Sequence, residues 1–166
     1  MPEPSVWYKR RVPKPLWAPW RLEYIQHADE ESECIFCRPD DDLLVVRGER
    51  ALVLLNKFPY TSGHLMIAPT RHTDDFVELP DEEATEVHRL AAQGIGALAQ
   101  VYAPQGFNLG WNLGRIAGAG IVGHVHLHVV PRWAGDTNFM PVLADVKVLP
   151  EALVETAARL RANWPT

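Results

Sequence analysis

The chain has 166 residues, of which 47% are hydrophobic and 22% are charged, and its formal net charge is −5. These values suit one folded domain and exclude a mostly disordered chain or a coiled coil. The acidic balance argues against general binding to nucleic acid, which needs a basic surface, so no nucleic-acid partner is expected. A local group of donors can still bind an anionic small molecule.

The first 33 residues are predicted to form an irregular N-terminal arm, because four prolines and the aromatic run Trp17 to Trp20 precede an acidic stretch. The arm is interpreted either as a strap over its own core or as a lid or subunit contact. No apolar segment follows the charged beginning, and no stretch approaches the ~18 apolar residues that a membrane span needs. We therefore expect a cytoplasmic protein without a membrane partner.

The pattern of apolar residues predicts an α+β fold. Apolar runs at 43–46 and 51–55 flank a polar turn and predict a β-hairpin, and further strands are predicted at 64–68, 107–111 and 124–130. Apolar residues at three- and four-residue steps predict a long helix over 80–103, although Gly94 and Gly96 weaken it. A C-terminal helix is predicted over 150–164, with Pro150 in its first turn. The order favours an antiparallel five-stranded sheet with one long helix and a C-terminal helix.

Histidines alternate with apolar residues between Gly123 and Arg132. Because successive side chains of a strand point to opposite faces, His124, His126 and His128 are expected on one face and the apolar residues in the core. The other interpretations are an exposed strand face, a tag fragment and a bare metal-binding row. A tag would not be internal, and a solvated face would normally use Thr, Lys, Glu or Arg. The pattern therefore favours a functional histidine site.

A glycine-rich loop leads into these histidines and contains Asn112, Arg115, Gly118 and Gly120. Glycines let backbone N–H groups approach an anion closely, while the amide and the guanidinium add side-chain donors. Such a loop alone is a weak signal, but beside a row of histidines it favours a phosphate site.

The two cysteines, Cys34 and Cys37, have the spacing of half a zinc site or of a redox pair. Two buried thiols without a function are a third interpretation. A disulfide-stapled secreted domain would carry more cysteines. The spacing alone leaves these alternatives open.

With these motifs, the sequence resembles the histidine-triad (HIT) family, and the resemblance extends from Cys34 to about Trp133. Within it, the bacterial branch of diadenosine tetraphosphate phosphorylases or hydrolases is the most similar. The segments that match the family are the histidine motif 124–130, the CIFC start at 34–37, and the segments 55–64 and 68–72. The segments 17–21 and 130–133 carry the similarity to the bacterial branch.

The resemblance implies a HIT domain over 34–166, behind an arm over 1–33, that acts at an α-phosphorus of diadenosine polyphosphates through a nucleotidyl-histidine. His126 matches the nucleophile, and His128 and His124 complete the catalytic triad. His128 would hold phosphate oxygens or protonate the leaving group. Hydrolysis and phosphorolysis remain open. An adenosine phosphoramidase and a nucleotide-binding module without turnover are the alternatives.

The resemblance also implies nucleotide contacts outside the triad. Asn56 matches a ribose-binding position and Asn112 an α-phosphate contact, and His64 is expected in a supporting role. Many family members have Gln followed by Ser or Thr before the triad, whereas this chain has Gly120 and Ile121, so a hydroxyl contact is missing. The backbone N–H groups of Gly118 and Gly120 are expected to replace this hydroxyl contact with phosphate. The ring of Trp133 is expected to stack on the nucleotide base. Packing in the core or a dimer is the other interpretation of Trp133.

For the cysteines, the resemblance implies a closed structural zinc site made by Cys34, Cys37, His72 and His124. A redox pair without metal stays the alternative, as it would be in a CxxC oxidoreductase. By resemblance alone, we expect a homodimer joined across the helix and a sheet edge.

Overall fold

The structure is a computed structural model that describes residues 33–136 and 151–165. The predicted division into an arm over 1–33 and a domain over 34–166 stays a prediction, because almost all of the arm, including Trp17 and Trp20, lies outside the described residues. Across the described part of the chain, no helix is long and apolar enough to cross a membrane.

Five strands form one antiparallel sheet in the order β1-β2-β3-β5-β4, which confirms the predicted fold class. The strands are β1 (Leu44–Arg47), β2 (Ala51–Leu55), β3 (Leu65–Pro69), β4 (Gly106–Trp111) and β5 (Leu127–Arg132). The helices are α2 (Asp81–Tyr102) and α4 (Leu153–Ala162), and a short 3₁₀ turn, η1, spans Arg115–Ala117.

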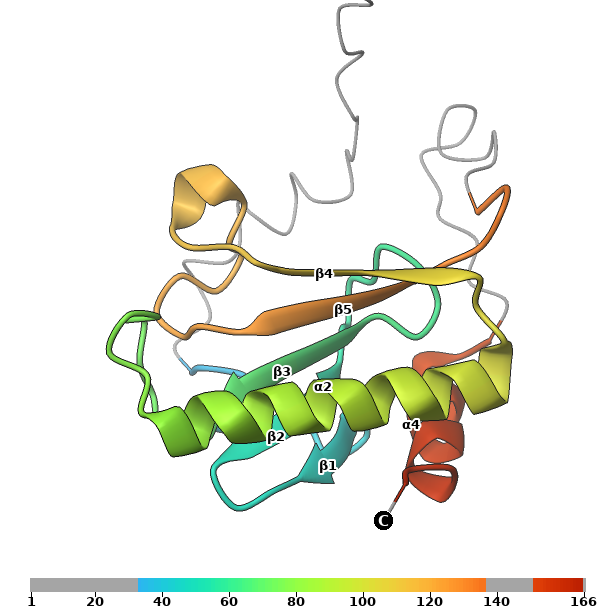
Figure 1. Ribbon diagram of the computed structural model, residues 1–166, viewed down its shortest axis with the longest axis horizontal. Coiled ribbons are helices and arrows are strands. Elements are labelled where there is room, and N and C mark those ends of the chain that lie inside the picture. The colour runs from blue at the N-terminus through green and yellow to red at the C-terminus, as the bar shows by residue number, and fades with distance from the viewer. Residues whose placement is uncertain (1–32, 137–150, 166) are drawn as a thin grey trace, which may run out of the picture.

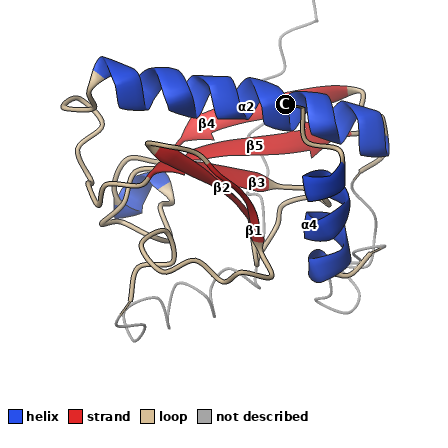
Figure 2. Ribbon diagram, turned by 90° about the horizontal axis from the view of Figure 1, so that it is seen from below, coloured by secondary structure: helices blue, strands red, loops and turns tan. Residues whose placement is uncertain are grey.

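The long helix α2 lies along one face of the sheet, and α4 lies beside β1, the strand at one edge of the sheet (Figures 1 and 2). Side chains alternate along β2, so Val53 and Leu55 join the core beneath α2 while Leu52 and Leu54 face the other side. There they pack with Phe36 in a second, smaller cluster. The sheet thus has an apolar layer on each face, and the face away from α2 meets the cysteine segment.

A tight turn before β3 positions His64. Gly63 has a backbone φ of 76°, a conformation that side-chain-bearing residues rarely adopt. A Cβ atom at this position would also lie only 2.6 Å from Leu98 Cδ2 on α2. Glycine is therefore required here, and the turn delivers His64, which is fully buried, to the start of β3.

The predicted helices are observed with small differences. The prediction of 80–103 agrees closely with α2, and Gly94 has a packing reason, because a Cβ there would lie 2.9 Å from Leu65 Cδ1 and 3.2 Å from Trp164. The prediction for α4 began too early, because the helix starts at Leu153 rather than 150. Pro150 itself lies outside the described residues.

Candidate functional site

An open pocket of about 390 Å³, including the solvent at its mouth, lies on the sheet face away from α2. Two histidines line it, and the other walls combine an amide, aromatic rings and apolar side chains. Its lining is Asn56, Phe58, Tyr60, Met66, Gly120, Ile121, His126 and His128. The sequence-predicted residues Asn56, Gly120, His126 and His128 are therefore brought together.

His126 presents an unprotonated nitrogen to this pocket. Its Nδ1 lies 2.8 Å from the carbonyl oxygen of His124 and donates its proton there, since a carbonyl can only accept. The neutral ring then has its lone pair on Nε2. Burial lowers the pKa of His126 below its ordinary value, against the opposing effect of that backbone hydrogen bond. The ring is neutral at neutral pH, as a nitrogen nucleophile requires.

The contact with His64 indicates that His128 has the opposite tautomer to His126. Two donors point at Nδ1 of His64: the Tyr60 backbone N–H at 3.1 Å and the Asn56 Nδ2 at 3.3 Å. His64 therefore carries its proton on Nε2, which lies 2.9 Å from His128 Nδ1 and donates to it. A neutral His128 then carries its own proton on Nε2. The pocket holds one imidazole with a lone pair at Nε2 beside one with a proton at Nε2.

The loop before the histidines contributes unequally. The Asn112 amide nitrogen lies 3.4 Å from His128 Nε2 and 3.4 Å from the Gly118 carbonyl oxygen. Both distances exceed the usual range for a hydrogen bond, so the shorter contact with His64 decides the tautomer of His128. The Gly118 N–H, predicted to meet phosphate, instead donates to the Arg115 carbonyl at 2.9 Å. Gly120 does line the pocket.

Trp133 lies away from the pocket lining. Its indole Nε1 donates to the carbonyl of Tyr102 at the end of α2, at 3.2 Å. This contact agrees with the packing interpretation of Trp133 rather than with base stacking.

The predicted strand 124–130 is wrong at its start, because β5 begins at Leu127. Backbone groups before Leu127 bind elsewhere: the Val125 N–H donates to the Thr73 carbonyl at 2.8 Å, and the His124 carbonyl accepts from His126. The three histidines consequently do not share one strip. His126 and His128 line the pocket, whereas His124 is fully buried and turns toward the cysteines.

Four side chains form a metal-type cluster, with their ligand atoms all within 4.8 Å of one another: Cys34, Cys37, His72 and His124. The shortest sulfur–nitrogen distances are 3.2 Å for Cys34 to His124 and 3.2 Å for Cys37 to His72. Tetrahedral zinc with its usual bond lengths separates sulfur and nitrogen ligands by roughly 3.5 Å. The donor set and its spacing therefore fit a four-coordinate divalent metal.

The protonation of this cluster also suits a metal. His124 Nε2 donates to the Pro69 carbonyl at 2.8 Å, which leaves Nδ1 as the lone-pair atom facing the sulfurs. Burial, followed by the charges of His72 and His126, lowers the pKa of His124 and keeps its ring neutral. Partial burial and the neighbouring Cys34 raise the pKa of Cys37, an effect that a bound cation would oppose.

Sequence reasoning missed the residues that connect the two centres and shape the pocket. The Phe36 ring contacts both His124 and His126, with ring centroids 5.0 Å apart in each case. Tyr60 stacks on His64 at 5.0 Å, and Phe58 and Met66 line the pocket. The aromatic residues that follow Asn56 were the only signal for this wall. Nothing in the sequence pattern indicated the role of Phe36.

The site and fold together define a class of α+β proteins with a pair of histidines lining an open pocket and a Cys₂His₂ cluster beside it. The HIT domain family model matches residues 38–135. The chain belongs to the histidine-triad (HIT) family.

Individual relatives agree with this membership. The chain is 36% identical over 162 residues to AP-4-A phosphorylase of Mycobacterium tuberculosis, which covers 90% of this chain and 83% of that protein. It is 34% identical over 103 residues to an adenosine 5'-monophosphoramidase of Schizosaccharomyces pombe, covering 60% and 74%. Among solved structures, a zinc-bound histidine triad family protein from Mycobacterium smegmatis aligns with a TM-score of 0.64 and 26% identity, covering 79% of this chain and 92% of that one.

Proposed function

We propose that this protein transfers a nucleotidyl group from a diadenosine polyphosphate, through a covalent intermediate on His126, to inorganic phosphate or water. The observation that carries the proposal is the histidine pair that lines the pocket, in which His126 Nδ1 lies 2.8 Å from the His124 carbonyl oxygen and His128 Nδ1 lies 2.9 Å from His64 Nε2. From these partners we infer a lone pair on His126 Nε2 and a proton on His128 Nε2. The similarity to AP-4-A phosphorylase supports this substrate class and favours phosphate as the acceptor.

In the first step, His126 Nε2 attacks the α-phosphorus and the bond from phosphorus to the bridging oxygen breaks. The leaving polyphosphate takes the proton from His128 Nε2, which avoids expelling a highly charged oxygen unprotonated. In the second step, phosphate or water gives its proton to His128 and attacks the same phosphorus, and the His126 lone pair is restored. We propose that Asn56, which lines the pocket, binds the ribose hydroxyls.

The products distinguish the acceptors. With diadenosine tetraphosphate and phosphate, we expect ADP and ATP in equal amounts, whereas water alone would give AMP and ATP. Chromatography of the nucleotides with and without phosphate measures this directly. ADP that forms without added phosphate would contradict a phosphorolytic second step.

An adenosine phosphoramidase is the second candidate, favoured by the similarity to the Schizosaccharomyces pombe enzyme. It would use the same His126 attack and expel an amine in place of a polyphosphate. Comparing kcat/KM for diadenosine tetraphosphate and for adenosine 5'-phosphoramidate separates the two. A higher value for the phosphoramidate would make it the substrate class.

We further propose that Cys34, Cys37, His72 and His124 bind a structural zinc ion. The zinc-bound Mycobacterium smegmatis relative supports the choice of metal. Four protein ligands leave no open position, so the ion would cross-link the chain and take no part in the chemistry. Reduced metal-binding thiols suit the cytoplasm, where we place the protein.

We also propose a homodimer formed through the outer edge of β4. This strand pairs with β5 and lies at the end of the sheet. Leu109 on β4 is 49% exposed, and nearby the rings of Phe76 and Trp111 meet at 5.1 Å, so apolar surface gathers at this edge. An exposed apolar strand edge is a ready template for a second copy of the same chain.

Leu109→Asp is therefore expected to convert a dimer to a monomer, because it places a charge in the apolar contact. Light scattering coupled to gel filtration measures the mass. Val154→Asp is the matched control, because Val154 on α4 is also 49% exposed. An unchanged dimer in Leu109→Asp, or a monomeric wild type, would contradict this interface.

A further inference from the structure

The four residues of the metal cluster differ in how firmly they are held. His124 is fully buried, and its second ring nitrogen donates to the Pro69 carbonyl, the usual way to orient a ligating histidine. His72 is exposed, and within residues 33–136 and 151–165 no hydrogen-bond acceptor is found for its Nε2. Apart from its contacts with Cys37 and the His124 ring inside the cluster, the position of His72 depends on how its backbone is anchored.

Three contacts anchor the segment that carries His72. The Thr70 N–H donates to the Arg50 carbonyl at 2.8 Å, and the Thr73 carbonyl accepts from the Val125 N–H at 2.8 Å. Between them, the Arg71 guanidinium donates two parallel hydrogen bonds to the Glu83 carboxylate, at 2.9 and 3.0 Å. A bidentate pair of this kind fixes direction as well as distance.

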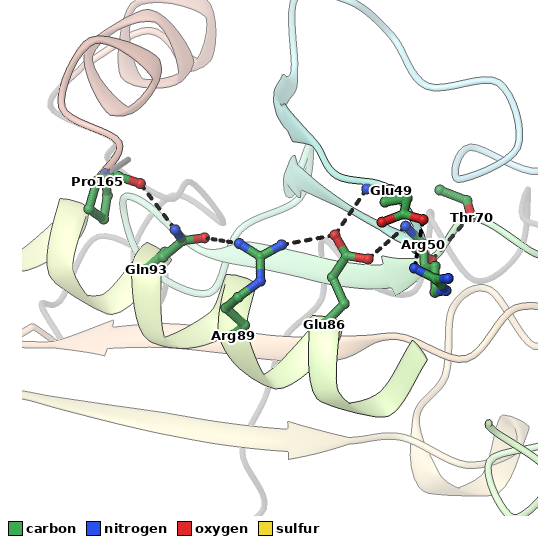
Figure 3. Close-up of polar contacts among 7 residues, drawn as sticks. All are labelled: Glu49, Arg50, Thr70, Glu86, Arg89, Gln93 and Pro165. Carbon is green, nitrogen blue, oxygen red and sulfur yellow. Dashed lines mark hydrogen bonds and ion pairs between the residues drawn. The ribbon is translucent and has the colours of Figure 1, made fainter. Parts of the chain in front are cut away.

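Two glutamates near the start of α2, Glu83 and Glu86, take part in this anchoring. Glu83 is buried and binds Arg71 directly. Glu86, one turn further along, accepts the backbone N–H groups of Glu49 and Arg50 at 3.0 and 2.7 Å (Figure 3). Because Arg50 in turn accepts from Thr70, α2 holds the His72 segment from two sides.

We propose that the Arg71–Glu83 ion pair is a positioning device for the metal centre, which sets the affinity for zinc by holding His72 in place without being a ligand. The inference rests on the proposed zinc site. Because Arg71 directly precedes His72, loosening the guanidinium frees the one exposed histidine ligand. The three other ligand residues keep their own contacts.

A merely structural ion pair would affect stability but leave zinc affinity unchanged. The chain offers a matched comparison in Arg159 and Glu151, whose side chains are 52% and 18% exposed, against 48% and 12% for Arg71 and Glu83. That second pair joins α4 to the chain before it and includes no residue of the metal cluster.

The experiment measures zinc affinity by competition with a chromogenic chelator, for Glu83→Gln and Arg71→Lys. Glu83→Gln keeps the shape but removes the charge, and Arg71→Lys keeps the charge but cannot form two parallel bonds. Both are expected to bind zinc about 10- to 100-fold more weakly than wild type, the usual effect of losing a residue that orients a metal ligand. Glu82→Gln and Arg159→Lys are the controls and should bind zinc as wild type does.

Wild-type zinc affinity in both Glu83→Gln and Arg71→Lys would overturn the positioning role. The same would follow if Arg159→Lys weakened zinc binding equally, since the effect would then be one of general stability. A wild-type protein that binds no zinc is a different result, because it would remove the metal centre itself. The nucleotide products are measured separately, so none of these outcomes is confused with a failure of the proposed reaction.

Discussion

His126→Ala is expected to lower turnover of diadenosine tetraphosphate by roughly 10⁴- to 10⁶-fold, the usual cost of losing a covalent nucleophile. The remaining pocket wall, including Asn56 and His128, is unchanged, so the variant should still bind nucleotide. Turnover is measured by product chromatography and binding by calorimetry. In the wild type, rapid quenching in acid-free conditions should also trap a nucleotidyl group on the protein, which the variant should lack.

His88→Ala is the matched control, because His88 is an exposed histidine on α2 outside the pocket lining. It should retain wild-type turnover. The buried His126 ring also packs on Phe36, so thermal unfolding of each variant checks that the fold is intact. A folded His126→Ala protein with wild-type turnover would contradict the covalent mechanism.

Removal of the metal is expected to have the largest effect on stability. A ligand present at 1,000 times its dissociation constant stabilises the folded state by about 4 kcal/mol. For a chain of this size, about 1 kcal/mol shifts the midpoint of thermal unfolding by roughly 2–4 °C. Dialysis against a strong chelator should therefore lower the midpoint by roughly 8–16 °C, measured by calorimetry, and adding zinc should restore it.

Variants that lack one ligand separate this effect from nonspecific damage by the chelator. Cys37→Ser and His72→Ala should have low midpoints that the chelator no longer changes. Elemental analysis of the purified wild type should give one zinc ion per chain. An unchanged midpoint after chelation, with no zinc in the protein, would leave the redox interpretation of the cysteines as the better one.

The local elements could be predicted because their signals are local. Alternating and helical apolar patterns located β2 and α2 within a few residues, and turn residues marked the start of β3. The start of β5 was predicted wrongly because the alternating pattern of residues 124–126 is typical of a strand. Tertiary contacts override this pattern in residues 124–126. The Val125 N–H donates a hydrogen bond to the Thr73 carbonyl, and the His124 ring donates one to the Pro69 carbonyl.

The candidate site was predictable only as a set of residue types. Resemblance to a family indicated Asn56, His126 and the four metal-cluster residues before the structure brought them together. The partners of these residues could not be predicted, because they come from distant segments with no motif of their own. Phe36 lies 90 residues from His126 in the sequence. Glu83 forms an ion pair with Arg71, but in the sequence it is one of several acidic residues in the first turn of α2, where acidic residues are common in any helix.

The hydrogen bond from His126 Nδ1 to the His124 carbonyl has a consequence for the energetics of the proposed intermediate. At rest it joins two neutral groups, but when phosphorus bonds to Nε2 the ring becomes cationic and the same bond becomes charge-assisted, roughly doubling in strength. The carbonyl therefore stabilises the adduct more than the resting ring, which is the condition for lowering a barrier. Because this acceptor is a backbone carbonyl, no side-chain substitution removes it. Its contribution to stabilising the intermediate therefore depends on the backbone conformation at His124.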